Sequence, residues 1–429
     1  MTAEQMRSRP GLLDTLGGWE RGDGMSGSAI GGVERSSTSD ALETARGLAE
    51  LIDAEADAAE RSGTMTPSVV DALRETELFW AMVPTELGGG GVDVVTAMSI
   101  VEEVTRVDGS TGWSLMANMT STGCVAAYAG DRAVDAMFGA GHDPAICAGM
   151  LAPRGAAVPD ETGYVVTGRY GFGSGIAHAN WTGSGCLVRQ RDGKVVTDEA
   201  GQAVLVACIV PAGQVRLEGN WDVHGMCGTG SYDYSIDGVH VDEDFSFPLP
   251  EMPRRRGGPS YDLGLLSLAA AGHAGVATGL AIGALQELAR YAESRKRQGM
   301  APLTDQQLFL HGVADADARL QAARAYVRQA FADAEATAVA GTRPTVEQTQ
   351  RIRQATTYVT TVAVDVVRFA YAWGGSAVIR TPGALARALR DVETASQHIY
   401  VDPNTYVMAA PSILEAWAEG LAPVGPRRH

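Results

Sequence analysis

Three differently patterned stretches, taken in order, constrain the fold of this chain more than any other feature. Residues 39–150 carry apolar side chains at helical spacing, whereas residues 151–250 hold short runs rich in Val that Gly, Asp and Pro separate. Residues 251–429 return to long Ala- and Leu-rich stretches with short connections. The chain is therefore expected to be α+β and mainly α, with an N-terminal helical domain, a middle β domain and a C-terminal antiparallel helical bundle.

Individual elements can be expected within each stretch. Helical spacing predicts helices at 93–106, 110–129, 262–297, 304–341, 345–373, 383–400 and 405–419. Strand runs are expected at 164–168, 186–188, 194–196, 203–211 and 235–241. The strand spacing is typical of a compact antiparallel barrel or sandwich and not of βαβ units.

The first 38 residues are expected to form a mobile tail. They are rich in Gly, Ser and Arg and lack periodicity. Residues 22–27 match the dinucleotide-binding pattern GxGxxG, but no strand pattern precedes them and no helix pattern follows. The role of this segment stays open.

Charge and cysteine usage argue against several classes of partner. The chain has 34 Lys+Arg against 51 Asp+Glu, a net charge of −17, so neither nucleic acid nor an anionic membrane surface is expected to bind. No apolar run reaches the ~20 residues of a membrane span, and the N-terminus has no apolar segment of the secretory type. Five scattered Cys without CxxC predict neither a disulfide framework nor a zinc site, and no HxxxH or HExxH suggests another metal. A cytoplasmic protein is expected.

Four local motifs narrow the choice. They are VDGSTGW at 107–113, FGSGIAHANW at 172–181, WDVHGMCGTGS at 221–231, and the set WGGS, LRD and QH within 373–398. In this order they resemble the acyl-CoA dehydrogenase superfamily, and more closely its oxygen-using branch, the group D two-component flavin-dependent monooxygenases. The resemblance spans roughly residues 40–420. It implies an N-terminal α-helical domain, a middle β-barrel and a C-terminal four-helix bundle, assembled as a homotetramer.

The same resemblance implies an activity. The chain would be the oxygenase component that takes reduced flavin (FMNH2 or FADH2) and O2, and inserts one oxygen atom through a flavin C4a-hydroperoxide. A separate NAD(P)H-dependent flavin reductase would supply the reduced flavin, which agrees with the lack of a credible NAD(P) fingerprint. The substrate would be an aromatic or heteroatom-containing small molecule: a phenol or polycyclic aromatic is the default, and an amine or sulfur compound stays open, as does FMN versus FAD.

Ser174 is the first expected catalytic residue. Gly173 and Gly175 flank it, and glycines allow the backbone to approach a flat ring closely. In the resembling monooxygenases, a serine matching Ser174 hydrogen-bonds near the flavin N5 and protects the hydroperoxide. The alternative is a plain turn before a strand.

His398 is the second expected catalytic residue. It matches the histidine of the group D enzymes, and an imidazole with a pKa near 6.5 suits removal of a proton from a phenol, thiol or amine. Two other roles stay open: holding the substrate by a hydrogen bond, or supporting the hydroperoxide.

Further residues follow from the resemblance. Cofactor contacts are expected from Gly173, Gly175, Trp113, Thr229, Ser231 and Arg295. A guanidinium suits phosphate because it is bidentate and always charged. Lys296 and Arg297 are the alternatives by register, and the segment could equally be a solvated basic helix end. The substrate is expected to meet Asn118, His178, Trp181 and Trp221, and for the two tryptophans core packing is the alternative.

Two other functions compete with this interpretation. An acyl-CoA dehydrogenase-type flavoprotein oxidising an acyl thioester needs a carboxylate to take the α-proton. Its usual Glu would fall within 397–400, which holds no acid, and the other family position, 262–268, offers only Asp262 at its edge. A flavin-binding or scaffolding protein with a decayed site is the third possibility, which the presence of both Ser174 and His398 disfavours.

Overall fold

The N-terminal part of the computed structural model is helical. The structure describes residues 38–250, 252–294 and 301–420, so the expected tail lies outside it except for Thr38. The helices are α1 (Thr38–Gly47), α2 (Ala49–Ser62), α3 (Pro67–Glu75), α4 (Val94–Thr105), α5 (Gly109–Tyr128) and α6 (Asp131–Phe138). Side-chain caps fix two starts: Asp93 accepts the N–H of Thr96 at 2.7 Å before α4, and Asp108 accepts the N–H of Thr111 at 2.8 Å before α5.

The middle part folds into one seven-stranded sheet. Its strands are β1 (Cys147–Pro159), β2 (Gly163–Gly173), β3 (Trp181–Val188), β4 (Leu205–Pro211), β5 (Arg216–Leu217), β6 (Tyr232–Asp242) and β7 (Ser246–Leu249). They are ordered β5-β6-β2-β1-β3-β4-β7.

Two strand predictions need correction. The expected antiparallel pairing is wrong for β1 and β3, which are parallel, because the chain leaves β2 through the 3-10 turn η4 (Ile176–His178) and crosses to the other side of β1. The expected strand at 194–196 forms only an isolated bridge between Arg189 and Val195. Strand β1 itself was not expected, since its Ala-, Gly- and Pro-containing sequence carries little β-branched signal.

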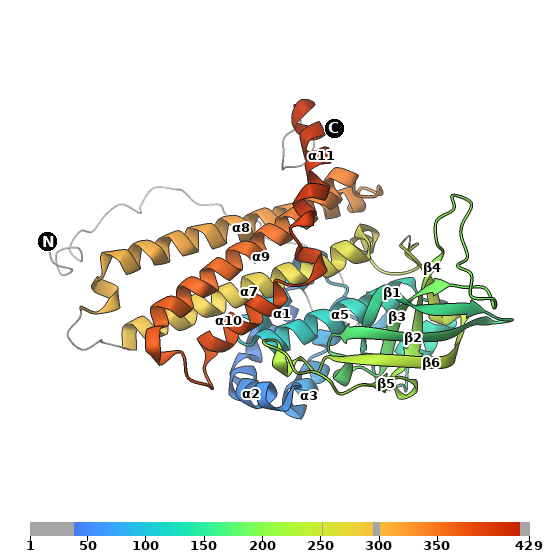
Figure 1. The fold of residues 1–429 in the computed structure, drawn as a ribbon, viewed down its shortest axis with the longest axis horizontal. Helices are drawn as coiled ribbons and strands as arrows, with labels where there is room; N and C mark the ends of the chain where they lie inside the picture. The colour runs from blue at the N-terminus through green and yellow to red at the C-terminus, as the bar shows by residue number, and fades with distance from the viewer. Residues whose placement is uncertain (1–37, 251, 295–300, 421–429) are drawn as a thin grey trace, which may run out of the picture. The chain divides into compact units, whose positions relative to one another are not determined.

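Long helices form the C-terminal part. They are α7 (Leu265–Ser294), α8 (Gln307–Val339), α9 (Val346–Gly374), α10 (Ala384–Ala395) and α11 (Asn404–Ala418). Helix α9 packs against α7, α8, α10 and α11 (Figure 1). A capping box between Thr345 and Gln348 begins α9, as the expected start at 345 requires.

Helix α7 is the central helix of this bundle. It is long and apolar enough to cross a membrane by composition, but 78% of its most apolar window is buried inside the fold. It packs against α4, α5, α8, α9 and α10. This burial is typical of a core helix surrounded by protein.

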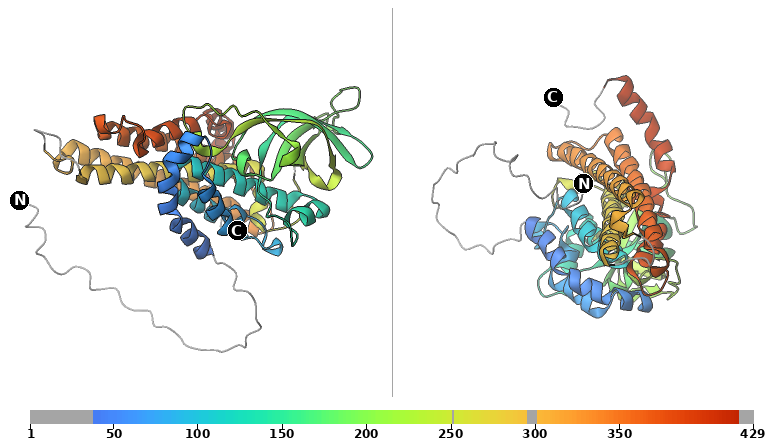
Figure 2. Two further views of the ribbon diagram at one scale, coloured as in Figure 1. Left: turned by 90° about the horizontal axis from the view of Figure 1, so that it is seen from below. Right: turned by 90° about the vertical axis from the view of Figure 1, so that its left-hand side faces the viewer.

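The sheet and the bundle meet at α5. Figure 2 shows the strands beside one end of the long helices, and α5 contacts both β1 and α7. The sheet has its own small core, in which Tyr170 and Tyr234 stack with ring centroids 4.8 Å apart. Loops that leave the sheet next to α5 therefore face the helical core, and the candidate site lies at this junction.

Candidate active site

A cavity of about 1080 Å3 opens between β1, β2, the loop that follows β5, α5 and the end of α10. We call it the large cavity. Its wall includes Trp113, Met150, Ala152, Arg154, Arg169, Gly171, Phe172, Ser174, Trp221, Val223, His224, Met226, Leu389, Glu393, Thr394, Gln397, His398 and Ile399. Four residues chosen from the sequence thus lie in one place: Ser174, His398, Trp113 and Trp221.

The hydroxyl of Ser174 is oriented by Trp113. The indole Nε1–H donates to Ser174 Oγ at 3.0 Å, and Trp113 is only 8% exposed, so the donor is held by its packing. Because the oxygen already accepts this bond, the hydroxyl proton is free to be donated to a ligand in the cavity. This arrangement can serve as a directed hydrogen-bond donor.

His398 is positioned by the short helix η11 (Ile399–Val401), which it caps. Its Nδ1 accepts the backbone N–H of Tyr400 at 3.3 Å. Burial lowers the pKa of His398 to about 4, so the ring is neutral at pH 7 and carries its proton on Nε2. The nitrogen left for a ligand is a donor, which favours the hydrogen-bonding role over the proton-removing role.

Aromatic rings surround His398. The ring of His273, on α7, lies 4.2 Å from it, centroid to centroid, and Tyr400 lies 4.8 Å away. Burial, and then the neighbouring His398, lower the pKa of His273 well below its usual value. Trp113 meets His273 edge-on at 4.9 Å, so the rings support each other from behind the cavity wall. No local motif points to His273, because its ring partners Trp113 and His398 lie far from it in the sequence.

Two bulky residues of the wall hold an unfavourable backbone. Phe172 has φ 60° and Met226 has φ 58°, and Glu77 is the only other non-glycine residue with positive φ in the described part of the chain. Phe172 is 65% exposed and meets Trp221 edge-on at 6.3 Å. Strain of this kind is common at ligand-binding positions. In the sequence, a large residue between two glycines, Gly171-Phe172-Gly173, already indicates an unusual backbone at this position.

Thr229, Ser231 and Gly175 lie behind the wall. Ser231 Oγ donates to Thr229 Oγ1 at 2.7 Å and accepts the N–H of Gly175 at 3.3 Å. Gly175 has φ +65°, and a Cβ there would stand 2.6 Å from Asn118 Oδ1. These residues fix the loop that carries Ser174; their expected contacts with a cofactor stay predictions.

Three expected substrate contacts do not line the large cavity. Asn118 is buried in α5 and donates to the carbonyl oxygens of Cys147 at 3.0 Å and Gly175 at 3.3 Å. His178 lies in η4, where burial lowers its pKa to about 4 and its Nε2 meets Thr64 Oγ1 at 3.4 Å. Trp181 begins β3 and stacks on Phe245 at 5.7 Å. After Ser174 the chain turns away from the cavity through η4, so His178 and Trp181 lie behind the wall.

One expected residue cannot be placed. Arg295, the candidate for flavin phosphate, lies outside the described residues, just after the end of α7. Within the described ranges, no group of three or more His, Cys, Asp or Glu could hold a metal ion.

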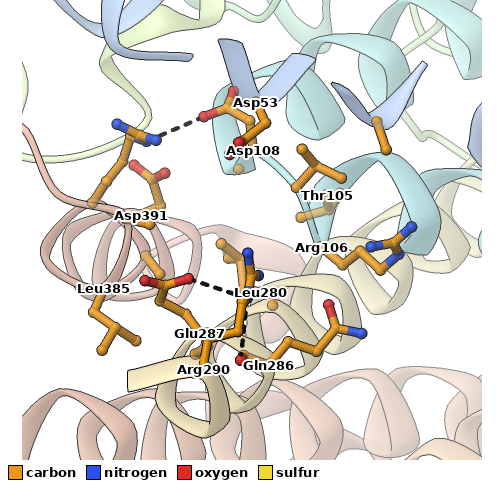
Figure 3. A pocket seen from close by; sticks show the side chains of 18 of the residues that line it. Asp53, Thr105, Arg106, Asp108, Leu280, Gln286, Glu287, Arg290, Leu385 and Asp391 are labelled. Atoms are coloured by element: carbon orange, nitrogen blue, oxygen red, sulfur yellow. Dashed lines mark hydrogen bonds and ion pairs between the residues drawn. The ribbon is translucent and has the colours of Figure 1, made fainter. Parts of the chain in front are cut away.

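A second, smaller hollow of about 230 Å3 lies between α2, α5, α7 and α10. We call it the acidic hollow, because Glu50, Asp53, Asp108, Glu287 and Asp391 are among its lining residues (Figure 3).

The buried arginine of the acidic hollow is paired with carboxylates in and beside it. Arg387 is 6% exposed and joins Asp57 at 2.6 Å, Glu60 at 3.4 Å and Asp108 at 3.3 Å. Burial, and then the neighbouring Asp108, raise the pKa of Asp391 to about 7. Asp391 Oδ1 accepts the N–H of Met226 at 2.6 Å, so this hollow also supports the wall of the large cavity.

Carboxylates decide between the competing functions. Glu393 is the one carboxylate in the described wall of the large cavity, and its Oε1 is paired with Arg368 at 2.7 Å. Asp262, at the other family position, is paired with Arg254 at 3.1 Å and does not line this cavity. The described wall therefore offers no unpaired carboxylate for removing an α-proton.

Comparison with known proteins settles the family. Residues 39–136 match the model of the acyl-CoA dehydrogenase N-terminal domain, and residues 271–403 match that of the C-terminal domain. The chain belongs to the acyl-CoA dehydrogenase family. This confirms the expected family and the helical, β and helical order of its parts.

Within the acyl-CoA dehydrogenase family, the relatives are monooxygenases. Indole-3-acetate monooxygenase of Pseudomonas putida is 29% identical over 87% of this chain and 94% of its own length. The flavin-dependent monooxygenase oxygenase subunit HsaA of Rhodococcus jostii is 26% identical over 79% and 88%. The prediction of a flavin-dependent monooxygenase, and so of an oxidoreductase, is confirmed.

Solved structures of the acyl-CoA dehydrogenase family share the fold. XiaF from Streptomyces sp., in complex with FADH2 and glycerol, matches with a TM-score of 0.79 and 21% identity, covering 91% of this chain and 97% of its own. Butyryl-CoA dehydrogenase from Megasphaera elsdenii matches with a TM-score of 0.72 and 18% identity, covering 90% and 100%. Members of both the monooxygenase and the dehydrogenase branch therefore share this fold. The residues of the site, and not the fold, must distinguish the two activities.

Proposed function

We propose that this chain is the oxygenase component of a two-component monooxygenase that binds reduced flavin and O2 in the large cavity and oxygenates an aromatic small molecule there. The observation that carries the proposal is the pair of donors on one wall: the Ser174 hydroxyl oriented by Trp113, and the neutral ring of His398. The described wall offers no unpaired carboxylate of the kind a dehydrogenase needs, because Glu393 is paired with Arg368.

The residues present fit a flavin. The wall combines flat apolar surface from Trp113, Phe172 and Trp221 with the directed donor of Ser174, which suits a planar ring with polar edges. Bound reduced flavin would supply the electrons that activate O2. The chain itself would orient the ring, donate hydrogen bonds from Ser174 and His398, and keep bulk water away.

The substrate class is proposed from the wall and the relatives. Aromatic side chains suit an aromatic ring, and relatives are named for indole-3-acetate and resorcinol. We therefore favour an indole or a phenol. A separate flavin reductase would deliver the cofactor, and both FMN and FAD are compatible with the described wall.

We further propose a cytoplasmic homotetramer that binds neither nucleic acid nor membrane. The net charge of −17 supports the last point. Helix α11 exposes Val407, Leu414 and Trp417, and such apolar surface is typical of contact with another protein chain, here a second copy. Light scattering of purified protein tests the oligomeric state.

Stopped-flow absorbance tests the proposed function. Anaerobic protein with FMNH2 or FADH2 is mixed with oxygenated buffer, and we expect an absorbing oxygenated species that lives far longer than with free reduced flavin. Ser174→Ala should shorten that lifetime and leave flavin affinity largely unchanged, while Ser246→Ala, in β7 outside the cavity, should behave like the wild type. Reoxidation of bound flavin at the rate of free flavin would sink the proposal.

A further inference from the structure

Two arginine side chains in the wall of the large cavity have no partner among the described residues. Arg154 lies on β1 and Arg169 on β2, and both are exposed. In the described part of the chain, no hydrogen bond or ion pair joins either guanidinium to another residue. By contrast, Arg216 on β5, the edge strand of the same sheet, is paired with Glu218 at 2.9 Å.

Strand geometry brings the two arginines together. The antiparallel register of β1 and β2 pairs Ala156 with Thr167, and Arg154 and Arg169 lie two residues beyond this pair on the two neighbouring strands. Arg154 lies in the irregular part of β1 between Met150 and Gly155, and both arginines line the same cavity. Two like charges on the wall of one cavity repel each other. Met150, on the other side of this irregularity in β1, lines the same cavity. A bound anion would remove the repulsion between the two guanidinium groups.

Nothing in the described wall neutralises them. The only carboxylate there, Glu393, is paired with Arg368. His398 is neutral at pH 7 because burial holds its pKa at about 4. The cavity wall is thus locally cationic in a chain whose net charge is −17.

A carboxylate on β6, the strand next to β2, is also engaged. Asp233, on β6, accepts the N–H of Phe172 at 3.0 Å with one oxygen and the side-chain amide of Asn220 at 2.8 Å with the other. These two bonds join Asp233 to the end of β2, where Phe172 lies, and to Asn220. The guanidinium groups therefore remain available to a ligand.

We propose that Arg154 and Arg169 form a subsite that binds the anionic oxygens of a ligand in the large cavity, either the carboxylate of an aromatic acid substrate or the phosphate of the reduced flavin. A guanidinium is permanently charged and presents a planar fork that matches either group. The aromatic part of the ligand would lie against Phe172 and Trp221. This inference rests on the proposed function and names the charged group that its ligand must carry.

Calorimetric binding without turnover tests the subsite. Two matched pairs of probes are titrated: FMN against riboflavin, and indole-3-acetate against indole-3-acetamide. Changing both arginines to glutamine (Arg154→Gln with Arg169→Gln) should weaken the charged member of one pair by about tenfold and leave its neutral member within about twofold. A loss confined to FMN assigns the subsite to the cofactor phosphate, and a loss confined to indole-3-acetate assigns it to a substrate carboxylate.

Two controls distinguish the loss of charge in the subsite from a general loss of charge or of folding. Arg216→Gln removes the same charge outside the cavity and should change no affinity, and the double lysine variant should recover part of the loss. The subsite is overturned if the wild-type protein prefers the charged member of neither pair, or if the double glutamine variant keeps the preference. Because these titrations involve no oxygen, a failed stopped-flow test of the proposed function would leave a positive result here intact.

Discussion

The large cavity and the acidic hollow hold their charges in opposite ways. In the acidic hollow, Arg387 is buried and joined to three carboxylates from α2 and the start of α5. In the large cavity, Arg154 and Arg169 have no partner among the described residues. Charges matched inside the chain hold α10 against its neighbours, whereas unmatched charges on a cavity wall are available to a ligand.

The sharpest way to break this comparison is to remove one arginine from each region. Arg387→Ala should lower the free energy of unfolding by about 3–5 kcal/mol, because it leaves buried carboxylates uncompensated. Arg154→Ala should change it by less than about 0.5 kcal/mol, as is usual for an exposed side chain. Urea unfolding measures both, and equal losses would contradict the contrast.

The free energy of unfolding should depend on pH with opposite signs for His398 in the large cavity and Asp391 in the acidic hollow. The pKa of His398 is about 4 against an ordinary 6.5, so between those values the unfolded chain binds a proton that the folded chain does not. Stability therefore falls as the pH drops, by up to about 3 kcal/mol for this residue. The pKa of Asp391 is about 7 against an ordinary 3.8, so its contribution is present at low pH and lost as the pH rises through 7.

Urea unfolding from about pH 5 to about pH 8 checks both signs. Relative to the wild type, His398→Gln should gain stability toward acid, and Asp391→Asn, which keeps an acceptor for the N–H of Met226, should gain it toward base. Shifts in the same direction for both variants would mean that the two regions do not differ as described.

A pair of substitutions sharpens the role of His398. If its Nε2–H donates to a ligand, His398→Gln keeps a donor and should retain activity within about tenfold, whereas His398→Ala should lose about a hundredfold. The measurement is single-turnover formation of oxygenated product with the best-used indole or phenol. If instead glutamine and alanine are equally poor, the imidazole acts as a proton acceptor.

The smallest expected effect concerns the strained wall. Phe172→Gly should raise the free energy of unfolding by about 0.5–1 kcal/mol, because glycine accepts φ 60° readily and the lost side chain is largely exposed. Phe172→Ala removes the whole ring but keeps the Cβ that makes the backbone conformation unfavourable, and serves as the matched control in the same urea experiment. A gain with alanine as large as with glycine would show that strain is not the cause.

The helices could be predicted closely from the sequence, whereas one strand could not. The expected helices at 304–341 and 345–373 correspond to α8 (Gln307–Val339) and α9 (Val346–Gly374), because apolar residues recur at helical spacing over many turns. Strand β1 was missed because it is held by its neighbours in the sheet rather than by its own residues. Arg154 lies on that strand, so its place beside Arg169 could not be foreseen.

The same limit applies to the candidate site. Ser174, His398, Trp113 and Trp221 were selected by short motifs, and the structure brings them to one wall. His178 was misplaced because a few residues of 3-10 turn redirect the chain, which no local pattern announces. Contacts across elements, such as the ring of His273 behind His398, depend on packing that a single sequence does not display.

Phe172 also bears on how such a chain can change over generations. Its side chain is largely outside the core, and its backbone conformation is one that folding alone would assign to glycine. Replacing Phe172 therefore costs little of the free energy of unfolding, while every replacement alters the surface that a ligand contacts. Within this scaffold, Phe172 is a position where new substrate preferences can arise by single steps without first acquiring extra stability elsewhere.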